Sequence, residues 1–120
     1  MVTSLEQLRD AIGVLAASPT DQQSYLAEIG HFSNLRKVDK LTNIDELALQ
    51  FEDATYLVVG LVQRRELTAE AARCVEKLDA AIAQVSGNGN SDFWTIGALY
   101  EDSRWTQIRV LAQDCLSEIA

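Results

Sequence analysis

Apolar residues recur at steps of three and four along most of the chain, which is the spacing of an α-helix with one buried face. The first such run, residues 5–15, predicts a helix that Ser4 caps, with Gln7 completing a Ser-x-x-Gln capping box. This helix is expected to stop before Ser18-Pro19, because serine caps helices and proline fits the first turn of a following one. A short second helix should end at Gly30, a natural residue for a left-handed C-terminus.

The longest helix is predicted in the middle of the chain, from a cap at Asn43 to about Val62. Its wide apolar stripe places it at the centre of the fold, and the stripe consists of Ile44, Leu47, Ala48, Phe51, Ala54, Leu57, Val58, Leu61 and Val62. Gly60 costs up to about 1 kcal/mol relative to alanine within a helix, which favours a close crossing with another helix there. Residues 31–42 repeat an apolar residue every third position, which indicates a helical turn or two.

Further helices are predicted after this central one. Thr68 caps a helix that Gly87 closes, with an inner face of Ala71, Val75, Leu78, Ile82 and Val85. Residues 87–90, Gly-Asn-Gly-Asn, predict a flexible loop, and a short helix should follow over about residues 92–101. The last helix begins after Asp102-Ser103, with an apolar face of Trp105, Ile108, Leu111, Ala112, Cys115, Leu116 and Ile119. We therefore expect an all-α fold, a compact bundle of about four main helices and two short pieces, in one domain over residues 1–120.

The charge balance narrows the choice of partners. The chain has 120 residues, of which 48% are hydrophobic, and its 18 acids and 10 bases give a net charge of −8 at pH 7. An acidic surface repels nucleic-acid phosphates and anionic lipid headgroups, so we expect neither as a direct partner. It suits a basic protein partner, or simply solubility. No apolar run reaches the length of a membrane span and the start lacks a secretory signal, so a cytoplasmic location is expected.

Residues that could carry catalysis or bind metal are few. His31 is the only histidine, which excludes zinc sites with two or more histidines, and we interpret it as a surface or helix-end residue. Cys74 and Cys115 lie among Ala, Val and Leu, so buried structural thiols are expected, and a bridge between them stays open. Residues 87–91 lack the Gly-Lys-Ser/Thr ending of a phosphate loop. We therefore expect no enzyme activity, metal site or cofactor, with carboxylate-only chemistry as the alternative.

Four acids mark the predicted central helix as a candidate binding surface. Asp45 and Glu52 are seven residues apart, as are Glu46 and Asp53, so each pair lies on a similar side of a helix two turns apart. No basic residue occurs over residues 41–63. The strip is suited to docking a cationic partner. The alternative is an ordinary solvated face, and the acids do not have the spacing of an EF-hand calcium loop.

A second candidate surface lies in the aromatic stretch from Phe93 to Trp105. Aromatic residues beside charges are typical of interface hot spots, which makes Tyr100, Glu101 and Asp102 a second group of candidate binding residues. Trp105 begins an apolar stripe and is assigned to the core. Phe93 and Trp94 are adjacent and point in different directions on a helix, so one of them is expected to be partly exposed or to pack under residues 87–90.

Three segments of the chain carry a resemblance. Residues 45–53 (DELALQFED), residues 93–99 (FWTIGAL) and the Trp105-x-x-Ile108-Arg109-x-Leu111-Ala112 ending look like those of small, acidic, helical bacterial proteins that resemble immunity partners of secreted or contact-delivered toxins. The resemblance implies a cytosolic protein that binds a cognate toxin domain and blocks its active site or an essential surface. Many such toxins are basic nucleases, which an acidic inhibitor reaches quickly. The alternative function is a structural or regulatory helical protein, either a homodimer or an adaptor in a larger assembly.

Overall fold

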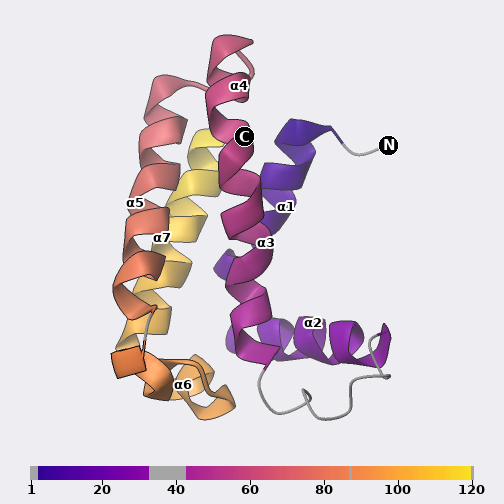
Figure 1. Ribbon diagram of the computed structural model, residues 1–120, viewed down its shortest axis with the longest axis vertical. Coiled ribbons are helices and arrows are strands. Elements are labelled where there is room, and N and C mark those ends of the chain that lie inside the picture. The colour runs from indigo at the N-terminus through magenta and orange to yellow at the C-terminus, as the bar shows by residue number, and fades with distance from the viewer. Residues whose placement is uncertain (1–2, 33–42, 87, 120) are drawn as a thin grey trace.

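The computed structural model describes residues 3–32, 43–86 and 88–119, and all regular structure within these ranges is helical (Figure 1). The α-helices are α1 (Ser4–Ala16), α2 (Pro19–Phe32), α3 (Glu46–Ala54), α4 (Val58–Gln63), α5 (Ala69–Val85), α6 (Ile96–Glu101) and α7 (Ser103–Ile119). The described residues also include the 3-10 segments η2 (Asn43–Asp45), η3 (Thr55–Leu57) and η4 (Asn88–Phe93). The predicted all-α fold is confirmed, whereas the turns predicted over residues 33–42 lie outside the described residues.

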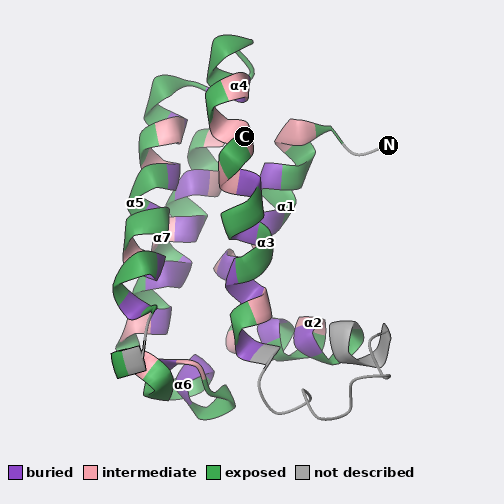
Figure 2. Ribbon diagram, viewed as in Figure 1, coloured by how far each residue is buried: buried purple, intermediate pink, exposed green. Residues whose placement is uncertain are grey.

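Four helical columns stand side by side and alternate in direction: α1, the α3–α4 run, α5 and α7 (Figure 1). α7 packs against α1 and α5, and α3 packs against α1. α2 and α6 lie at the end of this bundle where α3 begins (Figure 1). The buried residues lie on the sides of the helices that face the other columns (Figure 2), and the largest fully buried side chains are Trp105, Phe51 and Phe93. The helices therefore share one apolar core.

The N-terminal helices differ from the sequence prediction at one end each. Thr3, one residue before the predicted Ser4, caps α1: its hydroxyl accepts from the Glu6 backbone N–H at 3.1 Å, and Glu6 completes the capping box in place of Gln7. The predicted cap of α2 is confirmed, because the Ser18 hydroxyl accepts from the backbone N–H of Asp21, the third residue of the helix, at 3.1 Å. α2 does not end at Gly30 but continues to Phe32. Glycine permits the left-handed conformation that ends a helix and does not require it.

The central helix is shorter than predicted, because η3 divides it into α3 and α4. Within η3, the Thr55 hydroxyl donates to the Glu52 carbonyl oxygen at 2.6 Å. Such a bond back to the preceding turn competes with the regular α-helical ladder. Asn43 lies in η2, and Asp45 occupies the cap position of α3 without a side-chain cap bond. The close helix crossing predicted at Gly60 is wrong, since a Cβ there would meet only the Arg64 side chain of its own segment within 4 Å.

The two longest helices are α5 and α7, with 17 residues each. Thr68 caps α5 as predicted, accepting from the Ala71 backbone N–H at 3.1 Å. The five residues predicted for the inner face of α5 are all buried. Along α7, Trp105, Ile108, Ala112 and Cys115 are buried, and the other predicted positions, Leu111, Leu116 and Ile119, are partly buried and pack against the core.

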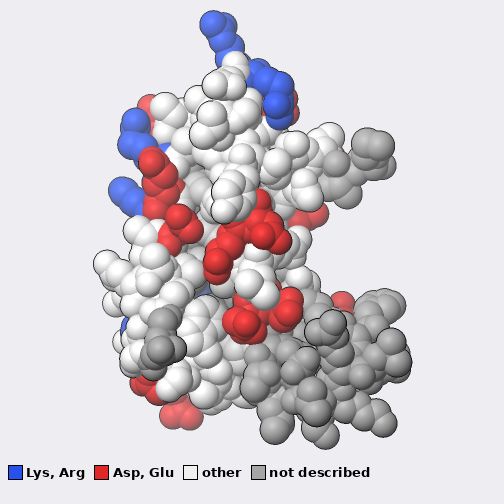
Figure 3. Space-filling view, in the orientation of Figure 1, with Lys and Arg blue, Asp and Glu red and all other residues white. Residues whose placement is uncertain are grey.

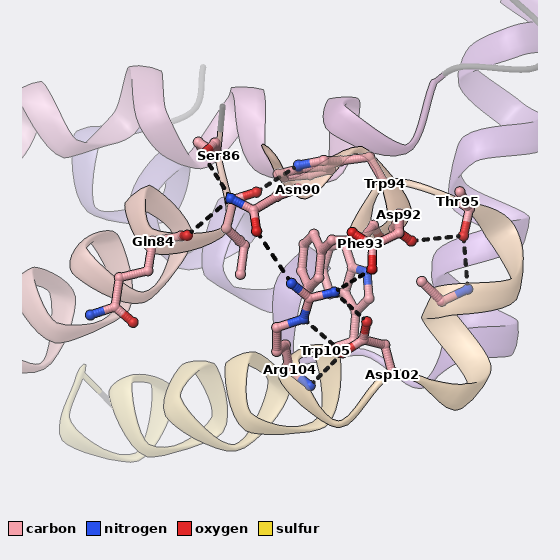
Figure 4. A network of polar contacts seen from close by, with 12 residues as sticks. Gln84, Ser86, Asn90, Asp92, Phe93, Trp94, Thr95, Asp102, Arg104 and Trp105 are labelled. Atoms are coloured by element: carbon pink, nitrogen blue, oxygen red, sulfur yellow. Dashed lines mark hydrogen bonds and ion pairs between the residues drawn. The ribbon is translucent and has the colours of Figure 1, made fainter. Parts of the chain in front are cut away.

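Specific side-chain bonds hold the described part of the connection between α5 and α7 (Figure 4). Of the loop predicted at residues 87–90, the last three residues begin η4, and Gly87 lies outside the described residues. The Asn90 side-chain amide donates to the carbonyl oxygens of Gln84 and Ser86, at 3.3 and 3.1 Å. Arg104 donates to Asn90, Asp92 and Asp102, which ties η4 to the start of α7. The short helix predicted over residues 92–101 is present only as α6, because η4 occupies the residues up to Phe93.

The aromatic side chains of this connection form one cluster. The rings of Phe93 and Trp105 stack with centroids 4.4 Å apart, and both are buried. The Trp105 indole N–H donates to the Phe93 carbonyl oxygen at 2.9 Å. Trp94 is half-buried, and its indole N–H donates to the Val85 carbonyl oxygen at 2.9 Å. The core assignment of Trp105 and the partial exposure of one of the two adjacent aromatics are therefore confirmed.

A buried polar pair, Gln22 and Arg109, connects four helices, and the sequence did not predict it. The Gln22 amide N–H donates to the carbonyl oxygens of Val14 and Leu15 at the end of α1, both at 3.2 Å. Its side-chain oxygen accepts from Arg109 of α7 at 3.1 and 2.8 Å. Arg109 also donates to the Leu99 carbonyl oxygen of α6 at 2.6 Å. The pair therefore joins α1, α2, α6 and α7 at the end of the bundle.

Candidate protein-binding surface

The four acids predicted as a binding strip lie at the two ends of α3. Asp45 and Glu46 stand at its start and Glu52 and Asp53 near its end, and the core-facing residues between them are Leu47, Ala48 and Phe51. Asp45, Glu52 and Asp53 are exposed, and Glu46 is half-buried. None of the four forms a salt bridge with another described residue. Acidic side chains gather over the middle of this face of the molecule (Figure 3).

Two exposed apolar side chains share the outer side of this run. Leu49 lies three residues before Glu52 and is 42% exposed, and Tyr56 lies three residues after Asp53 and is 87% exposed. Residues three apart are neighbours on a helix surface, so these side chains alternate with the acids along one face. A face that combines carboxylates with an exposed tyrosine can contribute both charge and apolar contact to a protein interface.

The field at this surface is negative across two helices. The pKa of Glu52 is raised, first by partial burial and then by repulsion from Asp79 of α5, from Asp53 and from Asp45. Carboxylates raise one another's pKa because each disfavours the charged form of the next. A cationic side chain bound here relieves that repulsion. The surface that attracts cations therefore extends from α3 onto α5.

The surface also reaches α2. The pKa of Tyr25 is raised, mainly by burial and further by the nearby Glu46 carboxylate. The Tyr25 hydroxyl donates to the Gln50 side-chain oxygen at 2.8 Å, which fixes the ring beside α3. The charge of Glu46 at the start of α3 therefore acts on a side chain of α2.

The second predicted group, Tyr100, Glu101 and Asp102, lies at the end of α6, which packs on α2 and α7. Tyr100 is 49% exposed, and its hydroxyl donates to the Gln23 side-chain oxygen at 2.6 Å. Glu101 is exposed. Asp102 instead accepts from Arg104 at 2.7 Å, and these bonds lower the pKa of its carboxyl to about 2. Asp102 is thus engaged in joining α6 to α7, which leaves Tyr100 and Glu101 as the accessible members of the group.

One surface feature, a groove, was not predicted from the sequence. A groove of about 520 Å³ lies between α4 and α5, and its apolar lining is Val58, Val59, Val62, Ala72 and Val75. Val59 is 66% exposed and Val62 is 37% exposed. The available signal was Val59, an apolar residue that does not fit the buried stripe of its helix. An apolar side chain outside the stripe becomes informative when it borders a concave surface.

The chain was compared with protein-family models, with curated proteins and with solved structures. None matches. The resemblance to immunity proteins therefore rests on the residues quoted for it and stays a prediction. Among the described helices, none combines the length and the apolar character needed to span a membrane.

The remaining reactive side chains are arranged as parts of the core. Cys74 and Cys115 are free; Cys115 is buried and Cys74 half-buried. Burial, and then the neighbouring Cys74, raises the pKa of the Cys115 thiol to about 12, so this thiol is protonated at neutral pH. No group of three or more His, Cys, Asp or Glu residues within the described ranges is placed to hold a metal ion. The side chain of His31 lies outside the described residues.

Proposed function

We propose that this chain is an immunity protein, which binds a cognate toxin domain in the cytoplasm of the producing bacterium and blocks it by protein–protein association. The observation that carries the proposal is the acidic surface of α3 and α5, where the exposed residues Asp45, Asp53 and Asp79 lie close enough to Glu52 to add to the effect of its partial burial and raise its pKa. This surface is suited to a positively charged partner, and a nuclease domain is positively charged because it binds nucleic acid.

The expected mechanism is electrostatic steering followed by apolar contact. Complementary charge raises the rate of association towards about 10⁸–10⁹ M⁻¹s⁻¹ at low salt, and salt screens the effect. Leu49 and Tyr56, which are exposed between and beside the acids, would then be covered by the partner. Tyr100 and Glu101 form a second contact region in this proposal.

The test uses the toxin domain expected to be encoded next to this gene, and it compares two double variants. Glu52→Lys/Asp53→Lys reverses the centre of the acidic surface, and Asp114→Lys/Glu118→Lys makes the same charge change at exposed positions of α7. By surface plasmon resonance, we expect the α3 variant to associate about tenfold more slowly and with a weaker salt dependence, whereas the α7 variant behaves like the wild type. In cells that also express the toxin, the α7 variant should protect as well as the wild type, and the α3 variant should protect less.

Two results would contradict the proposal. Equal slowing by both variants would mean that net charge alone matters, so the α3 surface would not be the interface. A neighbouring gene product that neither binds this chain nor harms cells in its absence would remove the immunity function itself.

A second candidate function, a homodimer or an adaptor in a larger assembly, is favoured by the exposed apolar residues Tyr56, Val59 and Val62. The three residues are spaced three apart along the chain, and exposed apolar patches mark interaction sites. Sedimentation equilibrium separates the two functions: a dimer over the micromolar range favours the second candidate, and a strict monomer removes its homodimer form.

A further inference from the structure

The groove between α4 and α5 combines an apolar lining with side chains that are still exposed. Its volume of about 520 Å³ lies within the range of roughly 300–1,000 Å³ that ligand pockets occupy. Val75 forms a buried part of its lining, at 2% exposure, whereas Val59 and Val62 keep 66% and 37% of their surface exposed. Both of these valines therefore have apolar surface left to bury.

The edges of the groove are acidic on the α5 side. Glu76 and Asp79 line it together with the valines. Asp79 also lies close enough to Glu52 of α3 to raise its pKa, so the acidic surface described above continues into the groove. No lysine or arginine is among the residues that line the groove. Of the bases near it in sequence, Arg73 pairs with Glu70 at 3.6 Å and Arg64 pairs with Glu66 at 2.8 Å, whereas Lys77 and Arg65 carry their charge outside the lining.

This charge argues against a second copy of the chain as the occupant. A symmetric dimer brings the same surface of both protomers together. Asp79 and Glu76 would then face the same acids of the other copy, and like charges brought together at an interface oppose association. An occupant with basic side chains beside its apolar ones meets no such repulsion.

We propose that the groove between α4 and α5 binds an amphipathic helix of the protein partner, with apolar side chains between Val59, Val62 and Ala72 and with lysine or arginine side chains towards Glu76 and Asp79. Helices bind grooves in this way through apolar residues at positions i, i+3, i+4 and i+7. The inference rests on the proposed partner-binding function and adds to it the kind of segment that the partner presents.

The test needs no toxin, so it can fail independently of the proposed function. The probe is a fluorescent helical peptide of about 18 leucine and lysine residues with leucines at i, i+3, i+4 and i+7, a length at which isolated helices become stable. A peptide with glutamate in place of lysine is its charge control. Fluorescence anisotropy then measures binding to the full chain and to two matched pairs of variants.

In the first pair, Val59→Lys alters the groove, and Val110→Lys makes the same change at a valine of α7 that is 50% exposed. The second pair is Asp79→Lys in the groove and Asp114→Lys on α7. We expect the groove variants to weaken binding of the lysine peptide about tenfold, the α7 variants to leave it within about twofold, and the glutamate peptide not to bind. All substituted positions are exposed, and circular dichroism melting checks that the variants fold.

Three results would overturn the inference. Equal weakening by Val59→Lys and Val110→Lys would mean that the peptide binds the acidic protein without using the groove. Absence of binding by the lysine peptide would mean that the groove does not accept such a helix. A wild-type dimer that Val59→Lys converts to a monomer would identify a second copy of the chain as the occupant.

Discussion

Gln22 is the buried side chain whose replacement should reveal most about the fold. It has no exposed surface, and its amide group serves two helices at once. The amide N–H donates to the carbonyl oxygens of Val14 and Leu15, which have no partner within α1 because they lie in its last turn. The side-chain oxygen accepts from Arg109, whose guanidinium is itself buried. The pKa of Arg109 is lowered by this burial, as expected for a cation removed from water.

The expected loss of stability follows from the hydrogen bonds that Gln22→Met would remove. Methionine has nearly the same length and volume, so little packing is lost. Two bonds to carbonyl oxygens contribute roughly 1–3 kcal/mol together, and the interaction with the charged Arg109 side chain contributes roughly 1.5–3 kcal/mol. The sum is a loss of roughly 2.5–6 kcal/mol, a large part of the roughly 5–15 kcal/mol that stabilises an ordinary domain.

Urea unfolding followed by circular dichroism measures this loss, and the melting temperature should fall by roughly 10–20 °C. Gln7→Met is the matched control, because Gln7 lies exposed on α1 and the same substitution there removes no buried bond. We expect the control to remain within about 0.5 kcal/mol of the wild type.

A double-mutant cycle with Arg109→Met isolates the bond between the two side chains. The double variant should lose less free energy of unfolding than the two single variants together, because each single variant leaves the other polar group buried without its partner. If Gln22→Met unfolds at the same urea concentration as the wild type, or if the two losses of stability simply add, the pair does not hold the helices together.

Two further predictions concern a helix interior and a helix end. Gly60→Ala should stabilise the chain by roughly 0.5–1 kcal/mol in urea unfolding, because the new Cβ would meet only the movable Arg64 guanidinium, at 3.2 Å. If the variant is instead less stable than the wild type, the added methyl group meets a contact that only glycine allows. The pKa of Asp102 falls from 3.8 in the unfolded chain to about 2 in the fold, so its contribution to stability is complete above the unfolded value and lost as the pH falls towards about 2. Asp102→Asn should therefore melt below the wild type at pH 6, with a difference that disappears near pH 2; a difference independent of pH would contradict the ion pair with Arg104.

The sequence predicts helices well here because their buried faces follow the 3.6-residue period. All five predicted inner residues of α5 are buried, and its cap at Thr68 is correct. The ends of helices are harder to predict, because neighbouring residues can each fit the pattern of a helix cap. Thr3 with Glu6 and Ser4 with Gln7 both satisfy the capping-box pattern. Only the Thr3 box forms, and its Glu6 places a negative charge in the first turn, where the helix dipole favours it.

Buried polar groups cannot be found in this way, because periodicity arguments follow apolar residues only. Gln22 and Arg109 occupy inward positions of α2 and α7, and nothing in their spacing separates them from surface residues. The same limit applies to the candidate site. The positions of the acids on α3 followed from their spacing of seven, but the proximity of Glu52 to Asp79 of α5 depends on how the helices are arranged in the bundle.

The groove has a cause that the sequence pattern hides. A 3-10 segment turns once in three residues where an α-helix needs 3.6, so the three residues of η3 rotate everything after them by about 60° relative to a continuous helix. A continuous helix would place Val58 and Val62 near the middle of the buried stripe and Leu61 at its edge. With the rotation, Leu61 reaches the core, with no exposed surface, while Val62 moves to its border and Val59 points to solvent. The 3-10 turn therefore both completes the core at Leu61 and leaves the apolar surface that lines the groove.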